Sequence, residues 1–323
     1  MITRRRLIAA SAGAVLAPRL AHAQASWPSR HVRLIVPFPP GGGTDAVGRI
    51  ISARLAEIWG QQMVIENRGG GGSNVGNEAA ARSQPDGYTI LFAAFPFATN
   101  QFLYSKLPYD PIADFAPITL IGTFPNILVV PNTSPAKSVA EFVAYAKTKP
   151  GDITFGSSGI GTSPHLNGEL FKRMTGIEMT HVPYRGAGPA ITDLIPGRLT
   201  MMFNTSGSLM PHVQSGRLRA LAVSSGKRFS AVPELPTVAE SGVPGFDVSS
   251  WYGLLAPAKT PPAIVSKMNA DAVKVLREPE IRKRLEGLGL EVVGSTPDEF
   301  GAFIKGEMAK WGPVIKAANI IAQ

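Results

Sequence analysis

Hydrophobic and polar positions alternate along this chain in two periods, one typical of strands and one typical of helices. The apolar run 32–36 predicts a buried strand, and residues 46–59 carry apolar side chains on one helical face before Gly60. Further strands are predicted at 63–66, 88–94, 118–130, 152–157, 178–184, 200–204, 218–223, 247–255 and 290–293. Most of these strands are followed by a helical pattern, so we expect an α/β protein with parallel sheets covered by helices.

Two further patterns indicate where predicted helices begin and where regular structure is interrupted. The sequences Ser138-Val139-Ala140-Glu141 and Thr296-Pro297-Asp298-Glu299 are typical of capping boxes that open helices. The segment 95–117 has prolines and aromatic residues without a sustained period, which predicts an irregular connection. With 323 residues, the chain suits two domains better than one small core.

The N-terminus has the features of a secretory signal peptide. Three arginines, Arg4 to Arg6, precede an apolar run over 7–17, and Ala21-His22-Ala23 forms a cleavage site, so we expect residues 1–23 to be removed. The arginines fit either a twin-arginine signal or an ordinary charged region. No later run reaches the roughly 18 apolar residues of a membrane span. The mature chain is therefore expected outside the cytoplasm, soluble and without membrane insertion.

The composition argues against several classes of protein, among them nucleic-acid-binding and cysteine-dependent proteins. Hydrophobic residues make up 44% of the chain and charged residues 17%, as in globular proteins. The formal charge of +9 falls to +5 without the four arginines of the signal peptide, and no basic stripe with aromatic residues suggests a nucleic-acid partner. The chain has no cysteine, which excludes disulfides, thiolate metal sites and a cysteine nucleophile.

Candidate chemistry lies where predicted strands run into loops rich in glycine, serine and threonine. The loops at 38–45, 156–163, 184–189 and 204–208 each precede a predicted helix. The first peptide N–H groups of a helix lack internal partners and favour anions, and glycine lets an anion approach them closely. Because ligands of α/β sheets bind beyond the carboxyl ends of strands, we expect these loops to line one cleft between two lobes.

The sequence gives weaker support to other kinds of site. Gly41-x-Gly43-x-x-Ala46, with Glu66 at 20 residues beyond Ala46, satisfies a loose dinucleotide-binding pattern, but Pro39-Pro40 and export argue against it. No Gly-x-Ser-x-Gly elbow surrounds Ser157 or Ser158, so a hydrolase has no local support. We expect no cofactor, no metal and no catalytic residue. The histidines at 165 and 181 are interpreted more readily as packed residues than as metal ligands or bases.

Five segments in order, 36–45, 66–70, 156–159, 181–186 and 193–195, resemble the Bug-type extracytoplasmic solute receptors of tripartite tricarboxylate transporters. The resemblance covers the whole mature chain. It implies a type II periplasmic-binding-protein fold, with two lobes of mainly parallel sheets joined by crossing strands around a ligand cleft. We expect residues 24–125 and 222–323 to form the first lobe and residues 126–221 to form the second.

The same resemblance implies a function. We expect a monomeric, non-enzymatic receptor that binds a small carboxylate (a di- or tricarboxylate, an amino acid, an aromatic acid or a related amide) and presents it to membrane permease subunits. The alternative is an exported enzyme, such as a hydrolase or a dehydrogenase, that uses the same cleft. The expected ligand-binding residues are Phe38, Pro40, Gly41, Gly42, Gly43, Thr44, Asp45, Phe95, Ser157, Ser158, Gly159, Gly161, Thr162, His165, Tyr184, Arg185, Gly186, Asp193, Asn204 and Thr205.

Overall fold

The computed structural model describes residues 27–322, so the predicted signal peptide, 1–23, lies outside the described residues. Strands and helices alternate, as the hydrophobic pattern predicts. The strands are β1 (Val32–Val36), β2 (Met63–Asn67), β3 (Thr89–Ala94), β4 (Phe115–Pro131), β5 (Thr154–Ser157), β6 (Thr180–Pro183), β7 (Met201–Thr205), β8 (Leu218–Val223), β9 (Ser249–Pro257) and β10 (Glu291–Val292).

The helices begin close to the predicted starts, with one addition. They are α2 (Gly43–Trp59), α3 (Asn74–Ala81), α4 (Pro96–Leu103), α5 (Val139–Lys147), α6 (Ser163–Thr175), α7 (Ala187–Leu194), α8 (Ser206–Gln214), α9 (Pro262–Arg277), α10 (Pro279–Gly287) and α11 (Pro297–Ala317), and a short 3₁₀ turn, Gly71–Ser73, precedes α3. The prediction that 95–117 is irregular is wrong over α4. That helix buries residues on several faces, among them Phe97, Ala98 and Asn100, so its sequence lacks an amphipathic period.

The capping predictions are confirmed in full at one helix and in half at the other. At α11 the Thr296 hydroxyl accepts from the Glu299 N–H, and the Glu299 carboxylate accepts from the Thr296 N–H. At α5 the Ser138 hydroxyl accepts from the Glu141 N–H, but the Glu141 carboxylate accepts from Lys137 N–H instead of the N-cap N–H. Both arrangements satisfy helix donors that would otherwise lack partners.

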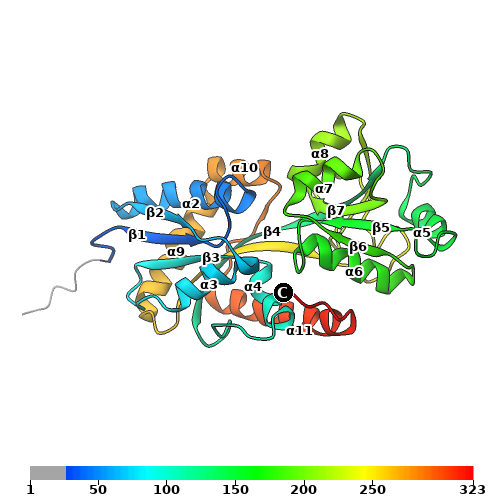
Figure 1. The fold of residues 1–323 in the computed structure, drawn as a ribbon. Coiled ribbons are helices and arrows are strands. Elements are labelled where there is room, and N and C mark those ends of the chain that lie inside the picture. The colour runs from blue at the N-terminus through cyan, green and yellow to red at the C-terminus, as the bar shows by residue number, and fades with distance from the viewer. Residues whose placement is uncertain (1–26, 323) are drawn as a thin grey trace, which may run out of the picture.

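The strands form two sheet regions that share the long strand β4 (Figure 1). β1 pairs in parallel with β2 and β3, and β5 pairs in parallel with β6 and β7, as expected for βα units. β4 and β9 join them through antiparallel pairing, so each region is mixed. We call the region of β1, β2, β3, β9 and β10 the first lobe, and the region of β5, β6, β7 and β8 the second lobe.

β4 changes partners at the point where it passes between the lobes. Pro125 is paired with β9, and the next residue, Asn126, is paired with β7. Ser224, which is fully buried, ties the crossing segments together: its hydroxyl accepts from Asn126 N–H at 2.8 Å and donates to the Val248 carbonyl at 2.6 Å. Its own peptide group bonds to the same two residues, so three segments meet at one side chain.

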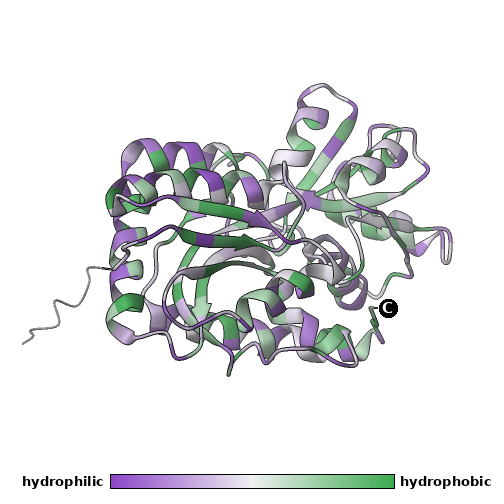
Figure 2. Ribbon diagram, turned by 60° about the vertical axis from the view of Figure 1, so that its left-hand side comes forward, coloured by the Kyte–Doolittle hydropathy of each residue, from purple (hydrophilic) through white to green (hydrophobic). Residues whose placement is uncertain are grey.

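Apolar side chains fill the space between the sheets and the helices. Figure 2 shows hydrophobic residues along the interior strands and hydrophilic residues over much of the outer helix surface. The fully buried side chains include Phe92, Phe155, Phe203, Trp251 and Trp311. One apolar cluster contains Phe95 and Trp311 of the first lobe together with Phe155 and Phe171 of the second.

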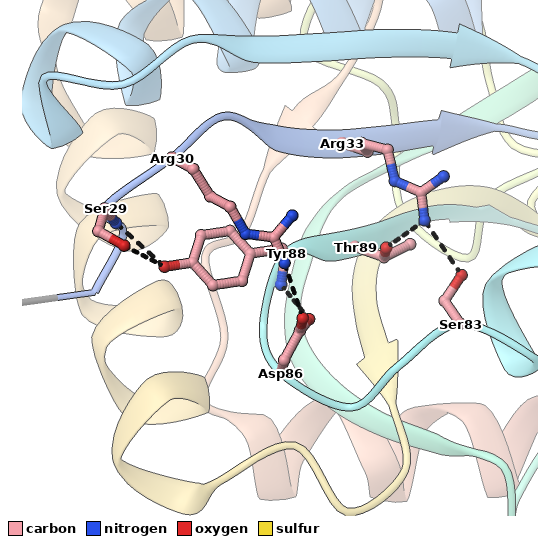
Figure 3. A network of polar contacts seen from close by, with 7 residues as sticks. All are labelled: Ser29, Arg30, Arg33, Ser83, Asp86, Tyr88 and Thr89. Atoms are coloured by element: carbon pink, nitrogen blue, oxygen red, sulfur yellow. Dashed lines mark hydrogen bonds and ion pairs between the residues drawn. The ribbon is translucent and has the colours of Figure 1, made fainter. Parts of the chain in front are cut away.

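The beginning of the described chain is fixed to the first lobe by polar contacts (Figure 3). Arg30 pairs with Asp86 at 2.9 Å, and its guanidinium lies 4.0 Å from the centre of the Tyr88 ring. Farther along β1, Arg33 donates to the Thr89 hydroxyl at 2.8 Å. These contacts join the starts of β1 and β3, so the strand that leads into the first glycine loop has a fixed origin.

Candidate functional site

A cleft of about 830 Å³ lies between the two lobes, and both lobes contribute to its walls. The starts of five helices open into it: α2 and α4 from the first lobe, and α6, α7 and α8 from the second. Its lining residues are Phe38, Pro39, Gly41, Gly42, Gly43, Thr44, Ala46, Val47, Ala94, Phe95, Pro96, Phe124, Ser158, Thr162, Ser163, Pro164, Arg185, Gly186, Ala187, Asn204, Thr205, Ser206, Gly207, Ser208, Ser250, Tyr252, Gly287, Leu288 and Leu290. Helix starts that converge from opposite sides concentrate peptide donors in one space.

The loop before α2 is held in shape by a carboxylate that lies behind it. Asp45 is almost completely buried, and its carboxylate accepts from the Gly41 N–H at 3.0 Å, from the Asn67 amide at 3.0 Å and from Arg49 at 2.9 Å. The bonds from Arg49 and Gly41 lower the pKa of Asp45 to about 2. The carboxylate therefore stays ionised and fixes the loop, while the N–H of Gly41 is already occupied.

Residues 42 to 44 present the free part of this loop to the cleft. Gly42 is the N-cap of α2 with φ −84°, and a side chain added there would meet nothing within 4 Å. Gly43 lies close to the wall, since a Cβ at this position would be 3.3 Å from the Tyr252 hydroxyl. As the first residues of a helix, 43 to 45 have N–H groups without acceptors inside the helix.

Aromatic side chains form much of the first-lobe wall. The ring centres of Phe124 and Tyr252 are 4.8 Å apart, and Phe38 and Phe95 lie on the same cleft. Burial raises the pKa of the Tyr252 hydroxyl, which keeps it a neutral donor. The site thus combines peptide donors with apolar surface, as small-molecule sites commonly do.

The second lobe offers hydroxyls, helix starts and one cation. Thr162 donates to the Gly159 carbonyl at 2.7 Å, and Thr205 shares a 3.0 Å hydrogen bond with Ser208. Asn204 is almost fully buried at the end of β7; its amide oxygen accepts from the Thr205 N–H, and its amide nitrogen has no partner among the described residues. Each of these groups faces the same space as the first glycine loop.

Arg185 is the single residue with a charged side chain in the lining, within the described part of the chain. It is exposed and lies next to Gly186, the N-cap of α7, whose φ of 115° favours glycine. Neither a carboxylate nor a histidine lines the cleft in residues 27–322. The charge of the site is therefore positive, from one guanidinium and five helix starts.

Twelve of the twenty predicted ligand-binding residues line this cleft: Phe38, Gly41, Gly42, Gly43, Thr44, Phe95, Ser158, Thr162, Arg185, Gly186, Asn204 and Thr205. The other eight do not: Pro40, Asp45, Ser157, Gly159, Gly161, His165, Tyr184 and Asp193. Among the eight, Asp193 is bonded to the Tyr184 hydroxyl at 2.8 Å and to Arg198 at 2.9 Å. Those bonds lower the pKa of Asp193. Polar residues next to the lining thus bond to one another and shape the loops.

Several lining residues were missed because they come from segments without a loop signature. Ser250 and Tyr252 lie on the crossing strand β9, Phe124 lies on β4, and Leu288 and Leu290 follow α10. Ser250, Tyr252 and Phe124 reach the cleft because the strands β4 and β9 cross between the lobes, and the leucines reach it because the segment after α10 packs against it. Local sequence does not predict this packing of distant segments. Glu66, the acidic residue of the dinucleotide pattern, pairs with Arg33 and Arg68 and does not line the cleft.

Residues 47–320 match the model of the tripartite tricarboxylate transporter family receptor. The chain belongs to this receptor family. It is 34% identical over 293 residues to the protein BugT of Bordetella pertussis. The aligned region covers 90% of each of the two chains. The resemblance to Bug-type receptors is therefore confirmed.

Solved structures of receptor relatives have the same two-lobed fold. Rpa4515 of R. palustris, solved with adipate, is 38% identical, with a TM-score of 0.84 over 91% of this chain and 99% of that one. MatC from Rhodopseudomonas palustris, solved with bound malate, is 32% identical, with a TM-score of 0.79 over 90% of this chain and all of that one. The predicted periplasmic-binding-protein fold is confirmed, with mixed pairing at the crossing strands.

Within residues 27–322, no group of three or more His, Asp and Glu side chains is arranged to hold a metal ion. No described helix combines the length and the apolar character that a membrane crossing requires.

Proposed function

We propose that this receptor binds a small organic acid in the cleft between its lobes, closes on it, and presents it to the permease subunits of a tripartite tricarboxylate-type transporter. The observation that carries the proposal is the convergence of five helix starts on a cleft whose lining includes one charged residue, Arg185. Peptide donors at helix starts suit a carboxylate, and they suit it without a permanent ion pair.

The free energy available from such donors is sufficient for a receptor. A hydrogen bond to a charged group contributes about 1.5–3 kcal/mol net. Micromolar affinity corresponds to roughly 8 kcal/mol, and association has its own entropic cost. Four or five donors from Gly43, Thr44, Ser158 and the starts of α7 and α8 supply that amount. Arg185 adds selectivity for anions rather than most of the affinity.

The ligands named with two relatives support a small acid as the ligand. Adipate and malate, the molecules named with Rpa4515 and MatC, are both small dicarboxylates. The cleft here combines peptide donors on both lobes with the aromatic wall of Phe38, Phe95, Phe124 and Tyr252. These features support a di- or tricarboxylate or a related aromatic acid, amino acid or amide with an apolar body.

The cellular role follows from the predicted export signal and the family. We propose that residues 1–23 are removed on export and that the mature receptor acts as a monomer in the periplasm. We also propose that residues 24–125 and 222–323 move as one lobe and residues 126–221 as the other. The change of partners in β4 at Pro125 and Asn126 supports a hinge at this position.

A thermal-shift screen of the mature chain over a panel of organic acids tests this function. Adipate, malate, citrate, glutamate and benzoate are compared with their amides and alcohols, after denaturation and refolding have removed any carried-over molecule. We expect saturable stabilisation by at least one acid and no chemical change in it. Release of product from a stabilising compound would contradict the receptor function, as would the absence of stabilisation throughout a broad acid panel.

A further inference from the structure

Two histidines that do not line the cleft lie directly behind its second-lobe wall. The rings of His165 on α6 and His181 on β6 are stacked, with centres 3.7 Å apart and an angle of 13° between their planes. The ring of Phe155 stacks on His181 at 4.8 Å. His165 is 3% exposed, so this pair is part of the interior of the second lobe.

Each ring is bonded to the loop 157–162, which carries cleft residues. The peptide N–H of Gly161 donates to Nδ1 of His165 at 3.0 Å. Nε2 of His181 is 2.7 Å from the Ser157 hydroxyl, which in turn accepts from the Gly159 N–H. Ser158 and Thr162, which lie directly beside these anchored positions in the chain, line the cleft. The histidines therefore fix the course of a loop whose other side is a binding surface.

The bond from Gly161 sets a condition on the charge of His165. A ring nitrogen can accept a hydrogen bond only when it carries no proton, so Nδ1 must be unprotonated and the ring neutral. Protonation of Nδ1 would place its N–H group against the peptide N–H of Gly161, so that two donors face each other. A cation at His165 would also lie against the stacked face of His181, where a second charge would repel it.

Burial and apolar neighbours favour the neutral state of His165. Phe155 of β5 and Leu103 of α4, which lies against Gly161, are apolar. Glu169, on the next turn of α6, has a carboxylate oxygen 3.9 Å from Nε2 of His165 and opposes this preference, but burial raises its own pKa and it is paired with Lys172 at 3.6 Å. Burial, with smaller contributions from charged neighbours, lowers the pKa of His165 to about 3 and that of His181 to about 4.

We propose that His165 is a positioning residue for the ligand site: as a neutral acceptor for Gly161 it holds loop 157–162, and thereby Ser158 and Thr162, in the binding geometry, and acidification releases this loop. The consequence for ligand binding rests on the proposed function; the loop's dependence on the ring does not. The sign follows from linkage. A ring whose pKa is lower in the closed loop than in an open, solvated one favours opening as the pH falls below about 6.5.

Amide hydrogen exchange of the ligand-free receptor at pH 7 and pH 4, corrected for intrinsic rates, tests the proposal. Loop 157–162 is compared with loop 41–45, whose anchor Asp45 remains ionised at pH 4 because its pKa is about 2. We expect protection of loop 157–162 to fall at least tenfold at pH 4, relative to loop 41–45. Equal protection of loop 157–162 at both pH values would overturn the proposal.

Two variants separate the acceptor from simple packing. His165→Asn keeps an acceptor oxygen near the place of Nδ1 but does not titrate, so its loop should be protected at pH 7 and remain protected at pH 4. His165→Leu fills the space without an acceptor, so its loop should exchange rapidly at both pH values. If loop 157–162 is equally protected in the two variants at pH 7, packing holds the loop rather than the hydrogen bond, and the proposal is wrong.

A measurement on the unmodified chain covers the case in which a variant does not fold. The ring C–H resonances of His165 should titrate below pH 5, while the protection of the loop should fall progressively below about pH 6.5. Titration of His165 near its ordinary value, with a protected loop throughout, would contradict the assignment. Since no ligand is present, these results decide the role of His165 whether or not any acid binds the cleft.

Discussion

The two loops that face each other across the cleft are built in the same way on the ligand side and in opposite ways behind it. Both present hydroxyl groups and helix-start N–H groups to the cleft. Loop 41–45 is anchored by an ionised carboxylate, Asp45, and loop 157–162 is anchored by stacked histidines, chiefly His165. The anchors differ in charge, while the binding surfaces are alike.

The difference between the two anchors explains why the carboxylate and the histidines near the site lie behind its lining. A carboxylate in the lining would repel an acid, but behind the loop Asp45 accepts the Gly41 N–H and fixes its conformation. The comparison also predicts a difference with pH. The stability that Asp45 contributes is complete above pH 3.8 and is lost as the pH falls through about 2, whereas His165 begins to oppose folding of its loop below pH 6.5.

The largest effect is expected from Gly42→Val, which blocks the first loop. A valine is compatible with φ −84° at this position, and its Cβ meets no neighbour within 4 Å, so its methyl groups would project into the space of the cleft. We expect the affinity for a stabilising acid, measured by calorimetry, to fall by about a hundredfold or more, with stability lowered by about 1 kcal/mol because valine is a poorer N-cap residue than glycine.

Gly306→Val is the matched control for this change, since Gly306 on α11 also has open space around it and does not line the cleft. It should bind like the unmodified receptor. Equal affinity of Gly42→Val and Gly306→Val would remove loop 41–45 from the site.

The next largest effect is expected from Asp45→Ala, which removes the anchor of the first loop. The Gly41 N–H, the Asn67 amide and Arg49 lose their acceptor, and bonds to a charged group contribute about 1.5–3 kcal/mol. We expect denaturant unfolding to show a loss of about 2–3 kcal/mol, and the affinity to fall at least tenfold.

Arg49→Ala serves as its control, because the guanidinium is mostly exposed and such ion pairs contribute about 0–1 kcal/mol. An equally large loss of affinity in Arg49→Ala would mean that the ion pair, and not the Gly41 bond, shapes the loop.

A moderate effect is expected from Ser158→Ala on the opposite wall. Ser158 lines the cleft between the two positions that the histidines anchor, and loss of one charged hydrogen bond corresponds to roughly a tenfold weaker affinity. Calorimetry on the folded variant checks this value. No change in affinity would place the second-lobe contact at α7 or α8 instead.

The smallest effect is expected from Arg185→Gln, and it tests whether peptide donors or a side-chain charge hold the ligand. Arg185 is exposed, so solvent and salt screen its charge, and we expect the affinity to fall by less than about tenfold. Titrations at low and high salt should show a weaker salt dependence in the variant. Complete loss of binding would make the arginine, rather than the helix starts, the main contact.

Much of this fold is predictable from sequence, because the strand and the helix of most βα units show their own hydrophobic periods and residues such as glycine mark where they end. The loops of the site are predictable as well, since several predicted strands end in loops rich in glycine and hydroxyl residues that each open a helix. The sequence also contained a hint that Asp45 anchors the loop instead of binding the ligand. Arg49 lies four residues later, a spacing typical of ion pairs within a helix.

The remaining features depend on topology. Tyr252 reaches the cleft because β9 crosses between the lobes, and His165 meets His181 because helix α6 packs on the parallel strands β5 and β6. Helix α4 escaped prediction because it is buried on several sides, as Phe97 and Asn100 illustrate. In each case the missing information is the packing of distant segments.

The most direct test of the central claim is a crystal structure of the mature receptor with an acid that stabilises it. The account predicts a carboxylate of that acid within about 3 Å of the peptide nitrogens of Gly43 and Thr44, with the second-lobe helix starts closed over the other end. A bound acid held by Arg185 alone, with its carboxylates away from both sets of helix starts, would contradict it.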